Sequence, residues 1–160
     1  MKRAVIDASV LVKLFFEEDH SEAAQRWVQT TSELLAPELI WAEAATVVWK
    51  RSRRGDLDRE DASKIAAQML RLPLQTRPSA DLLPDALEFA LRFDRTVYDS
   101  LYVALAVKTK SVVISGDKRL VNALADTPLA KHIIWIGAEL PTIERNLKRT
   151  SAPTPSRRRR

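Results

Sequence analysis

Short apolar runs that alternate with helical patterns are the feature that most restricts the fold of this chain. Runs typical of strands occur at residues 4–6, 34–36, 74–76, 112–114 and 133–136. Between them, apolar residues recur at helical spacing over residues 9–17, 21–30, 37–54, 58–70, 80–93, 98–108 and 118–124. Strands that alternate with helices favour a mainly parallel sheet. We therefore predict an α/β fold, a three-layer α/β/α sandwich.

Four isolated acids interrupt these apolar runs. Asp7 follows the strand pattern AVI, and Asp117 follows VVISG. Glu43 lies within LIWAEAATVV, and Asp99 directly precedes SLYVALAV, so we expect both acids to lie on buried helices and to point into the protein. An ionised carboxylate in apolar surroundings costs on the order of several kcal/mol unless a partner, hydrogen bonds or a metal offset this cost.

The positions of the four acids favour a shared site. Functional residues of open α/β sheets gather outside the carboxyl ends of the strands, where Asp7 and Asp117 are expected. Each acid also has a structural alternative: Asp7 and Asp117 could cap helices, and Asp99 could be a favourable charge at a helix start. Glu43 has no Lys or Arg at i±3 or i±4 to pair with. Taken together, the acids predict a site for a hard divalent cation, Mg²⁺ or Mn²⁺.

Such a site suits the hydrolysis of phosphodiesters, because a divalent cation lowers the pKa of a bound water and stabilises charge on the leaving oxygen. Ser9 and Ser115 each lie two residues from one of the acids, and they either orient the metal ligands or serve as turn and cap residues. His20 and His132 are predicted to be surface residues outside the site.

Positive charge is concentrated at the end of the sequence. Residues 142–160 carry seven Lys or Arg and one acid, which leaves a net charge of −1 on the rest of a chain whose formal charge is +5. Proline, small polar residues and like charges predict that residues 142–160 form a disordered basic tail after a folded domain at residues 1–141. In that domain, a few cations are either solvated or contact nucleic-acid phosphates: Lys50, Arg51, Arg53, Arg54 and Lys118.

Composition and termini indicate the compartment. The chain has no cysteine, so a disulfide framework and a thiolate metal site are both excluded. No apolar run approaches the roughly 20 residues of a membrane span, and the first residues lack a signal-peptide pattern. We expect a cytoplasmic protein without membrane contact.

Four motifs of this chain occur in order over residues 4–136 and read VIDASVLVK, PELIWAEAATVVWK, YDSLYVALA and VISGDKRL. They resemble those of PIN-domain ribonucleases, specifically the VapC-like toxins of bacterial toxin–antitoxin pairs. The resemblance implies cleavage of RNA with Mg²⁺ or Mn²⁺, a homodimer, and inhibition by a cognate small VapB-like antitoxin that occupies the acidic pocket. It also places several residues on the family's acidic and hydroxyl positions: Asp7, Glu43, Asp99, Asp117, Ser9 and Ser115. Thr46 departs from the pattern, since family members often carry asparagine there.

Two other readings of the sequence compete with a nuclease. Phosphatases that use an aspartate nucleophile carry a second Asp two residues later, where this chain has Ser9, and receiver domains phosphorylate an Asp after a middle strand, where Leu74 to Thr76 offers none. The second rival is a catalytically silent PIN-like domain that only binds nucleic acid. Such a domain could lose one of the four acids, whereas this sequence retains them all.

Overall fold

The computed structural model describes residues 1–138, and five parallel strands form its sheet in the order β3-β2-β1-β4-β5. The strands are β1 (Arg3–Ile6), β2 (Glu33–Pro37), β3 (Leu74–Arg77), β4 (Val113–Ser115) and β5 (Ile133–Trp135). The helices are α1 (Ala8–Val12), α2 (Ser21–Gln29), α3 (Leu39–Arg54), α4 (Arg59–Met69), α5 (Leu83–Phe93), α6 (Val97–Lys108) and α7 (Lys118–Leu124), with short 3₁₀ turns η1 (Ser79–Asp81) and η2 (Ala130–His132). The predicted tail and its boundary at residue 141 lie outside the described residues.

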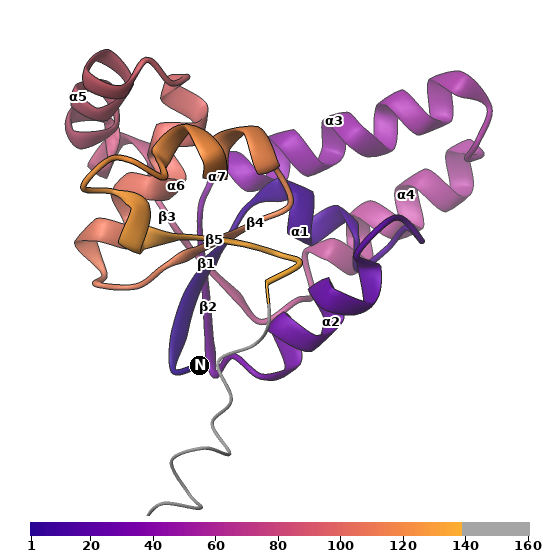
Figure 1. Ribbon diagram of the computed structural model, residues 1–160. Coiled ribbons are helices and arrows are strands. Elements are labelled where there is room, and N and C mark those ends of the chain that lie inside the picture. The colour runs from indigo at the N-terminus through magenta and orange to yellow at the C-terminus, as the bar shows by residue number, and fades with distance from the viewer. Residues whose placement is uncertain (139–160) are drawn as a thin grey trace, which may run out of the picture.

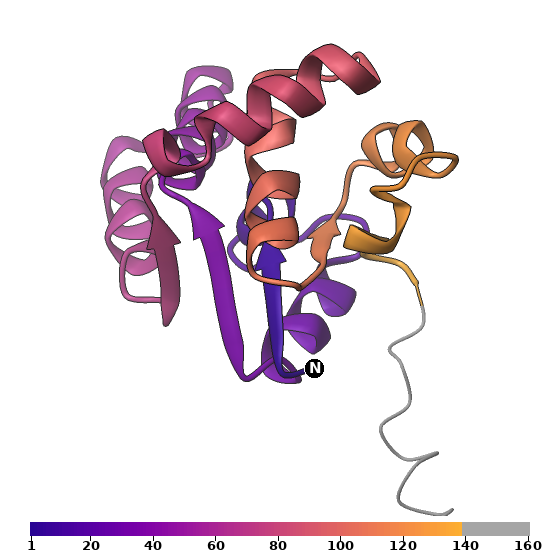
Figure 2. The same cartoon turned by 90° about the vertical axis from the view of Figure 1, so that its left-hand side faces the viewer.

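Helices cover both faces of the sheet, which confirms the predicted α/β sandwich. Helix α6 crosses one face, and α1 and α2 lie behind the other (Figure 2). Helix α5 packs against α6, whereas α3 and α4 run side by side as a hairpin (Figure 1). None of the helices in residues 1–138 combines the length and apolar character needed to cross a bilayer.

Burial explains why the sequence patterns differ from helix to helix. Every residue of α6 from Ser100 to Ala106 is buried, so this helix is apolar on all sides as predicted. Helix α3 buries only Ile40, Ala44 and Val48, a single stripe at i, i+4 and i+8. The expectation that α3 is buried around Glu43 was therefore wrong: its small and apolar residues extend onto faces that remain partly exposed.

Three elements differ from the sequence prediction by more than one residue at a boundary or in their division. Helix α1 ends at Val12 rather than near residue 17, because the amides of Leu14 and Phe15 bond three residues back in tighter turns. Pro37 ends β2, where it pairs with Arg77, instead of opening the next helix. The pattern over residues 80–93 divides into η1 and α5, since Pro84 has no amide hydrogen to donate and occupies the first turn of α5.

The chain reverses its direction across the sheet next to β1. Strands β1, β2 and β3 follow one another toward one edge, and β4 then returns to the other side of β1. The amide of Asp7 donates to the carbonyl of Ile114 at 3.3 Å, so the ends of β1 and β4 are joined. In doubly wound folds this reversal opens a crevice at the carboxyl ends of the strands, where functional groups gather.

Candidate active site

Asp7 lies at this reversal point and is only 8% exposed. Its Oδ1 accepts hydrogen bonds from the Ser9 hydroxyl at 2.5 Å and from the Val10 amide at 3.0 Å, and its Oδ2 accepts one from the Ser115 hydroxyl. Burial raises the pKa of Asp7, the hydrogen bonds lower it in part, and the charge of Asp117 raises it again. Asp7 therefore caps α1 and is also a desolvated carboxylate within the field of a second one.

Ser9 and Ser115 both reach beyond Asp7 to the loop that follows β4. The Ser9 oxygen accepts the Gly116 amide at 2.7 Å, and the Ser115 oxygen accepts the Asp117 amide at 3.0 Å. A β-carbon at Gly116 would lie 2.8 Å from the Ser9 oxygen, so the close approach of this loop to α1 requires glycine. The two hydroxyls thus fix the Asp7 carboxylate against the loop that carries Asp117.

Glu43 lies on α3 and accepts a hydrogen bond from a residue of α6. The Tyr102 hydroxyl donates to Oε2 of Glu43. Burial raises the pKa of Glu43, the bond from Tyr102 lowers it, and the charges of Asp7 and Asp99 raise it further. These electrostatic contributions connect Glu43 with both aspartates in a single acidic cluster.

Asp99 and Asp117 occupy helix starts in this conformation. Asp99 lies in the first turn of α6, where its Oδ2 accepts the Thr96 hydroxyl at 2.7 Å. Asp117 is exposed and caps α7, with its Oδ1 accepting the amides of Arg119 at 2.8 Å and Leu120 at 3.4 Å. Asp117 is therefore a helix cap, as the structural alternative proposed, and its side chain is exposed rather than in the protein core.

The donor set suits a hard cation in its chemistry, because all four acids offer carboxylate oxygens and no ion pair within residues 1–138 engages any of them. In the same residues, no three acidic or imidazole side chains are placed so that they could hold a metal ion. In this conformation the carboxylates of Asp99 and Asp117 accept hydrogen bonds at their own helix starts.

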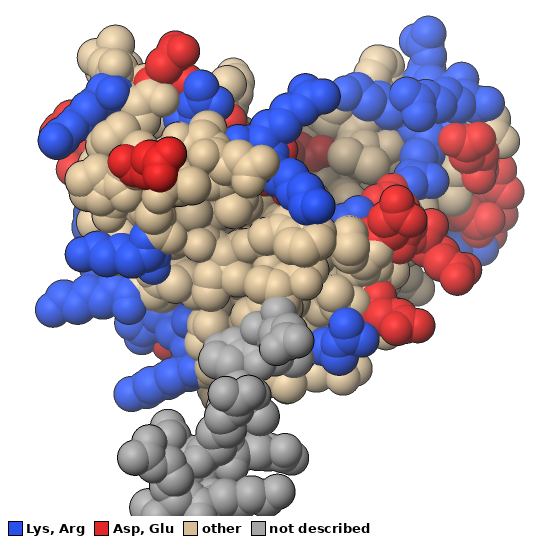
Figure 3. Space-filling model, viewed as in Figure 1, with Lys and Arg blue, Asp and Glu red and all other residues tan. Residues whose placement is uncertain are grey.

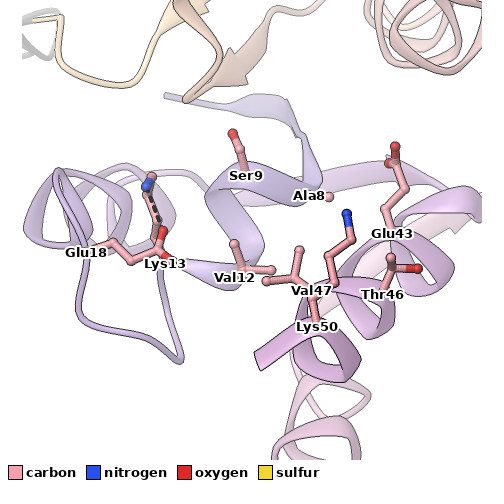
Figure 4. A pocket seen from close by; sticks show the side chains of 9 residues that line it. All are labelled: Ala8, Ser9, Val12, Lys13, Glu18, Glu43, Thr46, Val47 and Lys50. Carbon is pink, nitrogen blue, oxygen red and sulfur yellow. Dashed lines mark hydrogen bonds and ion pairs between the residues drawn. The ribbon is translucent and has the colours of Figure 1, made fainter. Parts of the chain in front are cut away.

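A cavity of about 480 Å³ opens beside Glu43, between α1 and α3 (Figure 4). Its apolar lining comes from Ala8, Val12 and Val47, and its polar lining from Ser9, Lys13, Glu18, Glu43, Thr46 and Lys50. The ammonium of Lys50 points into the space between Ala8 and Glu43 (Figure 4). The hydroxyl of Thr46 donates to the carbonyl of Ala42 at 2.8 Å, so it is bonded within its own helix.

Glu18 closes one end of this groove by joining two cations. Lys13 lies 3.0 Å from its Oε2, and Arg51 bonds its Oε1 while stacking over the ring of Phe16 at 4.3 Å. Burial alone would raise the pKa of Glu18, but Lys13 and Arg51 outweigh burial and hold this pKa below its ordinary value. Arg51 is therefore engaged within the protein.

The remaining predicted nucleic-acid contacts lie on two surfaces. Lys50, Arg53 and Arg54 are exposed near the end of α3, with Arg53 5.4 Å from the Trp49 ring centroid. Lys118 lies at the start of α7, where its ammonium is 4.1 Å from the Trp135 ring centroid. Only Lys50 of this group lines the groove beside Glu43.

Several residues of the site could not be singled out from the sequence. Tyr102, Lys13 and Glu18 take their roles from contacts between elements that are distant in sequence. Tyr102 left a weak signal, since it is the one hydrogen-bonding side chain within LYVALAV and a buried phenol usually has a partner.

Comparison with known proteins gives the family. The PIN domain family model matches residues 4–125. Ribonuclease VapC3 of Pyrobaculum aerophilum is 36% identical over 120 residues, which cover 74% of this chain and 92% of that protein. The fold is similar to Mycobacterium tuberculosis VapC20, described as a sarcin-ricin loop cleaving toxin (TM-score 0.60, 20% identity, 75% and 94% of the two chains), and to a chain of a toxin–antitoxin complex from Klebsiella pneumoniae (TM-score 0.57, 14% identity, 86% and 99%). The chain therefore belongs to the PIN-domain family, among its VapC-like members.

Proposed function

We propose that this protein is a metal-dependent endoribonuclease that hydrolyses RNA phosphodiester bonds and acts as the toxin of a toxin–antitoxin pair. The observation that carries the proposal is the buried Asp7 carboxylate, which three hydrogen bonds hold within the field of further acids. The sequence identity of 36% to Ribonuclease VapC3, over 74% of this chain, supports the same reaction.

Residues around the acids have separate tasks in this proposal. Ser9 and Ser115 hold both oxygens of Asp7 in place, and Tyr102 orients Glu43. Because burial raises its pKa above the ordinary value of glutamate, Glu43 is suited to accept a proton from an attacking water at its Oε1, the oxygen that Tyr102 does not bond. Lys50, which points into the adjoining groove, is placed to contact a phosphate next to the one that is cleaved.

Mg²⁺ or Mn²⁺ would be held by Asp7, Glu43, Asp99 and Asp117. When bound, it supplies a water of lowered pKa and stabilises charge on the leaving oxygen. Asp99 and Asp117 accept hydrogen bonds at helix starts, so binding of the cation would compete with these bonds.

A cognate small antitoxin is the proposed inhibitor. The groove beside Glu43 combines apolar side chains with the carboxylate of Glu43, which forms no ion pair within residues 1–138, so it suits a peptide segment that presents a cation, preferably arginine, to Glu43. Co-expression with the product of a small adjacent reading frame should suppress both toxicity and RNA cleavage. Growth arrest that persists despite a stable complex between the two proteins would contradict this role for the partner.

A homodimer is also proposed. Helix α5 exposes Leu83, Leu87 and Leu91, which are 50%, 48% and 79% accessible and lie at i, i+4 and i+8 on one stripe. An apolar stripe of this kind on a surface helix is typical of an interface. Sedimentation of Leu87→Lys protein as a monomer, with the wild type as a dimer, is the expected result.

Replacement of single carboxylates tests the central proposal. Asp7→Asn and Asp99→Asn should each abolish cleavage of cellular RNA, measured by sequencing RNA ends after incubation with purified protein. Asp58→Asn is the matched control, because Asp58 caps α4 through the Asp61 amide at 2.8 Å much as Asp7 caps α1. Near-normal cleavage by Asp7→Asn protein would favour the silent nucleic-acid-binding alternative.

A further inference from the structure

A second cavity, of about 610 Å³, lies at the amino-terminal edge of the sheet, opposite the acids. Its polar lining comes from the start of β1, the end of α6 and η2, and consists of Arg3, Lys110, Ser111, Lys131 and His132. No acidic residue lines this cavity in the part of the chain that the structure describes. Lys and Arg side chains also gather on the lower left of the space-filling view, the side on which α6 ends (Figure 3).

Among the cations that line this basic cavity, the two lysines have the least neutralisation by acidic side chains. Both Lys110 and Lys131 are exposed, and within residues 1–138 neither forms an ion pair. Arg3 is partly neutralised, since its Nε lies 2.6 Å from Oε2 of Glu33. The Nδ1 of His132 lies 2.9 Å from the carbonyl oxygen of Ser111, which fixes the imidazole against the loop before β4.

The backbone of Lys110 gives an independent indication that this side chain has a task. It follows the last turn of α6 with a φ of 52°, and the amides of Lys110 and Ser111 bond the carbonyls of Val107 and Ala106. This is the helix ending at which glycine is usual, because a β-carbon is strained at positive φ. A lysine here places a cation beside the cavity at a position where glycine would be more stable.

We propose that this basic cavity binds phosphate groups of the RNA strand, apart from the site of cleavage. The inference rests on the proposed ribonuclease function. Strand β1 connects the two sites: Arg3 and Asp7 are four residues apart, roughly 13 Å along a strand. The cavity and the acids lie at opposite ends of this central strand, so an RNA strand that reaches both would run around the surface of the domain and place different phosphate groups at the lysines and at the acids.

The test measures RNA binding by the full chain in chelator, where cleavage plays no part. The variant is Lys110→Gln combined with Lys131→Gln, and the probe is a fluorescent single-stranded RNA titrated at several salt concentrations. The control, Arg59→Gln combined with Arg71→Gln, removes the same charge from two exposed residues that line neither cavity. The lysine variant should bind severalfold more weakly, and its slope of log affinity against log salt should fall by about 1.4, or about 0.7 for each phosphate lost.

A substitution at Lys110 alone separates binding from folding. Lys110→Gly should weaken RNA binding as much as Lys110→Gln does, while melting at or above the temperature of the wild type because the strain is relieved. Cleavage at saturating RNA should not change in any of the Lys110 and Lys131 variants, whereas their KM should rise and that of the arginine control should not.

The proposal is overturned if the lysine variant and the wild type have equal affinity and salt slope, or if the arginine control loses as much affinity as the lysine variant. Loss of antitoxin binding with unchanged RNA binding would likewise overturn it and would assign the cavity to a protein partner. If the wild type cleaves no RNA but its RNA binding depends on these lysines, the proposed ribonuclease function fails and the phosphate site stands.

Discussion

The hydroxyl of Tyr102 donates a hydrogen bond to Oε2 of Glu43 and so connects α6 to α3 across 59 residues of sequence. Tyr102 is buried, and burial together with the Glu43 charge raises its pKa, so the phenol keeps its proton and remains a donor. For Glu43, burial raises the pKa while this bond lowers it. The pKa of Glu43 thus depends on the balance between its burial and the hydrogen bond from Tyr102.

Removal of that donor should shift the pH dependence of cleavage. In Tyr102→Phe protein, burial of Glu43 remains but the bond that lowers its pKa is lost, so this pKa should rise. Because the ionised carboxylate is the active form, the acid limb of the kcat/KM profile should move to higher pH. The measurement is RNA cleavage from pH 5 to 9, and stability should fall by only about 1 kcal/mol.

Tyr98→Phe is the matched control on the same helix, since Tyr98 is 61% exposed. Its profile should coincide with that of the wild type. A Tyr102→Phe profile that keeps the wild-type acid limb would mean that Glu43 does not titrate in the reaction, although it could still bind metal.

Asp7 is predicted to oppose stability in the absence of metal. Burial raises the pKa of Asp7 above its ordinary value of 3.8, so the folded state binds this proton more tightly than the unfolded state. Stability from this group is therefore present at low pH and decreases as pH rises from the ordinary value through the raised one. Asp7→Asn removes that loss while its amide can still bond Ser9, Ser115 and Val10.

Thermal unfolding in chelator checks this expectation. Asp7→Asn protein should melt above the wild type at pH 7, and the difference should shrink as pH approaches the ordinary range of aspartate. Asp58→Asn, at an exposed cap, is the control for the loss of a capping charge without burial. A lower melting temperature for Asp7→Asn at pH 7 would mean that the charged cap on α1 outweighs the desolvation of Asp7.

Two glycines should separate activity from stability. At Gly116 the backbone is unstrained, but a β-carbon meets the Ser9 oxygen at 2.8 Å, so Gly116→Ala should displace Ser9 from Asp7 and reduce cleavage severalfold or more. At Gly55 nothing lies within 4 Å, but φ is 84°, so Gly55→Ala should cost roughly 1 kcal/mol through backbone strain and leave cleavage unchanged. Denaturant unfolding and RNA cleavage should be measured on both variants. If the two variants cleave RNA equally well, the contact of Ser9 with Asp7 does not contribute to cleavage.

The fold could be predicted because its signals are local. Four of the five strands contain a short apolar run, the exception being β3 with the sequence LQTR, and α6 is apolar on all sides because it is buried on all sides from Ser100 to Ala106. The errors arose where tertiary packing overrides local preference. Pro37 is tolerated in β2 because it is the last residue of that strand, and the apolar residues of α3 that were expected to surround Glu43 include exposed ones such as Ala42 and Ala45.

The acids of the site could also be found from the sequence, because an isolated carboxylate in an apolar run is unusual enough to notice. Their environments could not. Asp7 directly follows β1 and is buried, whereas Asp117 follows β4 after Gly116 and is exposed; the hydroxyls of Ser9 and Ser115 bond Asp7 and also accept the amides of Gly116 and Asp117. Arg51 belonged to a predicted basic cluster, yet Glu18, 33 residues away, engages it.

Asp117 allows a test of metal binding that is separate from helix capping. The sequence alone suggests that Asp117→Asn should raise the melting temperature in chelator, because four crowded carboxylates repel one another. The exposure of Asp117 and its bonds to two amides change this expectation. Asparagine caps a helix about as well as aspartate, so Asp117→Asn should melt within about a degree of the wild type in chelator.

In Mg²⁺ or Mn²⁺ the two proteins should diverge. A ligand that binds only the folded state adds about 2.7 kcal/mol at a hundredfold excess over its dissociation constant, or several degrees for a chain of 160 residues. The wild type and Asp58→Asn should gain this increment in full, whereas Asp117→Asn should gain clearly less because it offers the cation a neutral amide. If Asp117→Asn gains as much as the wild type, Asp117 acts only as the cap of α7, and the cation is held by Asp7, Glu43 and Asp99 alone.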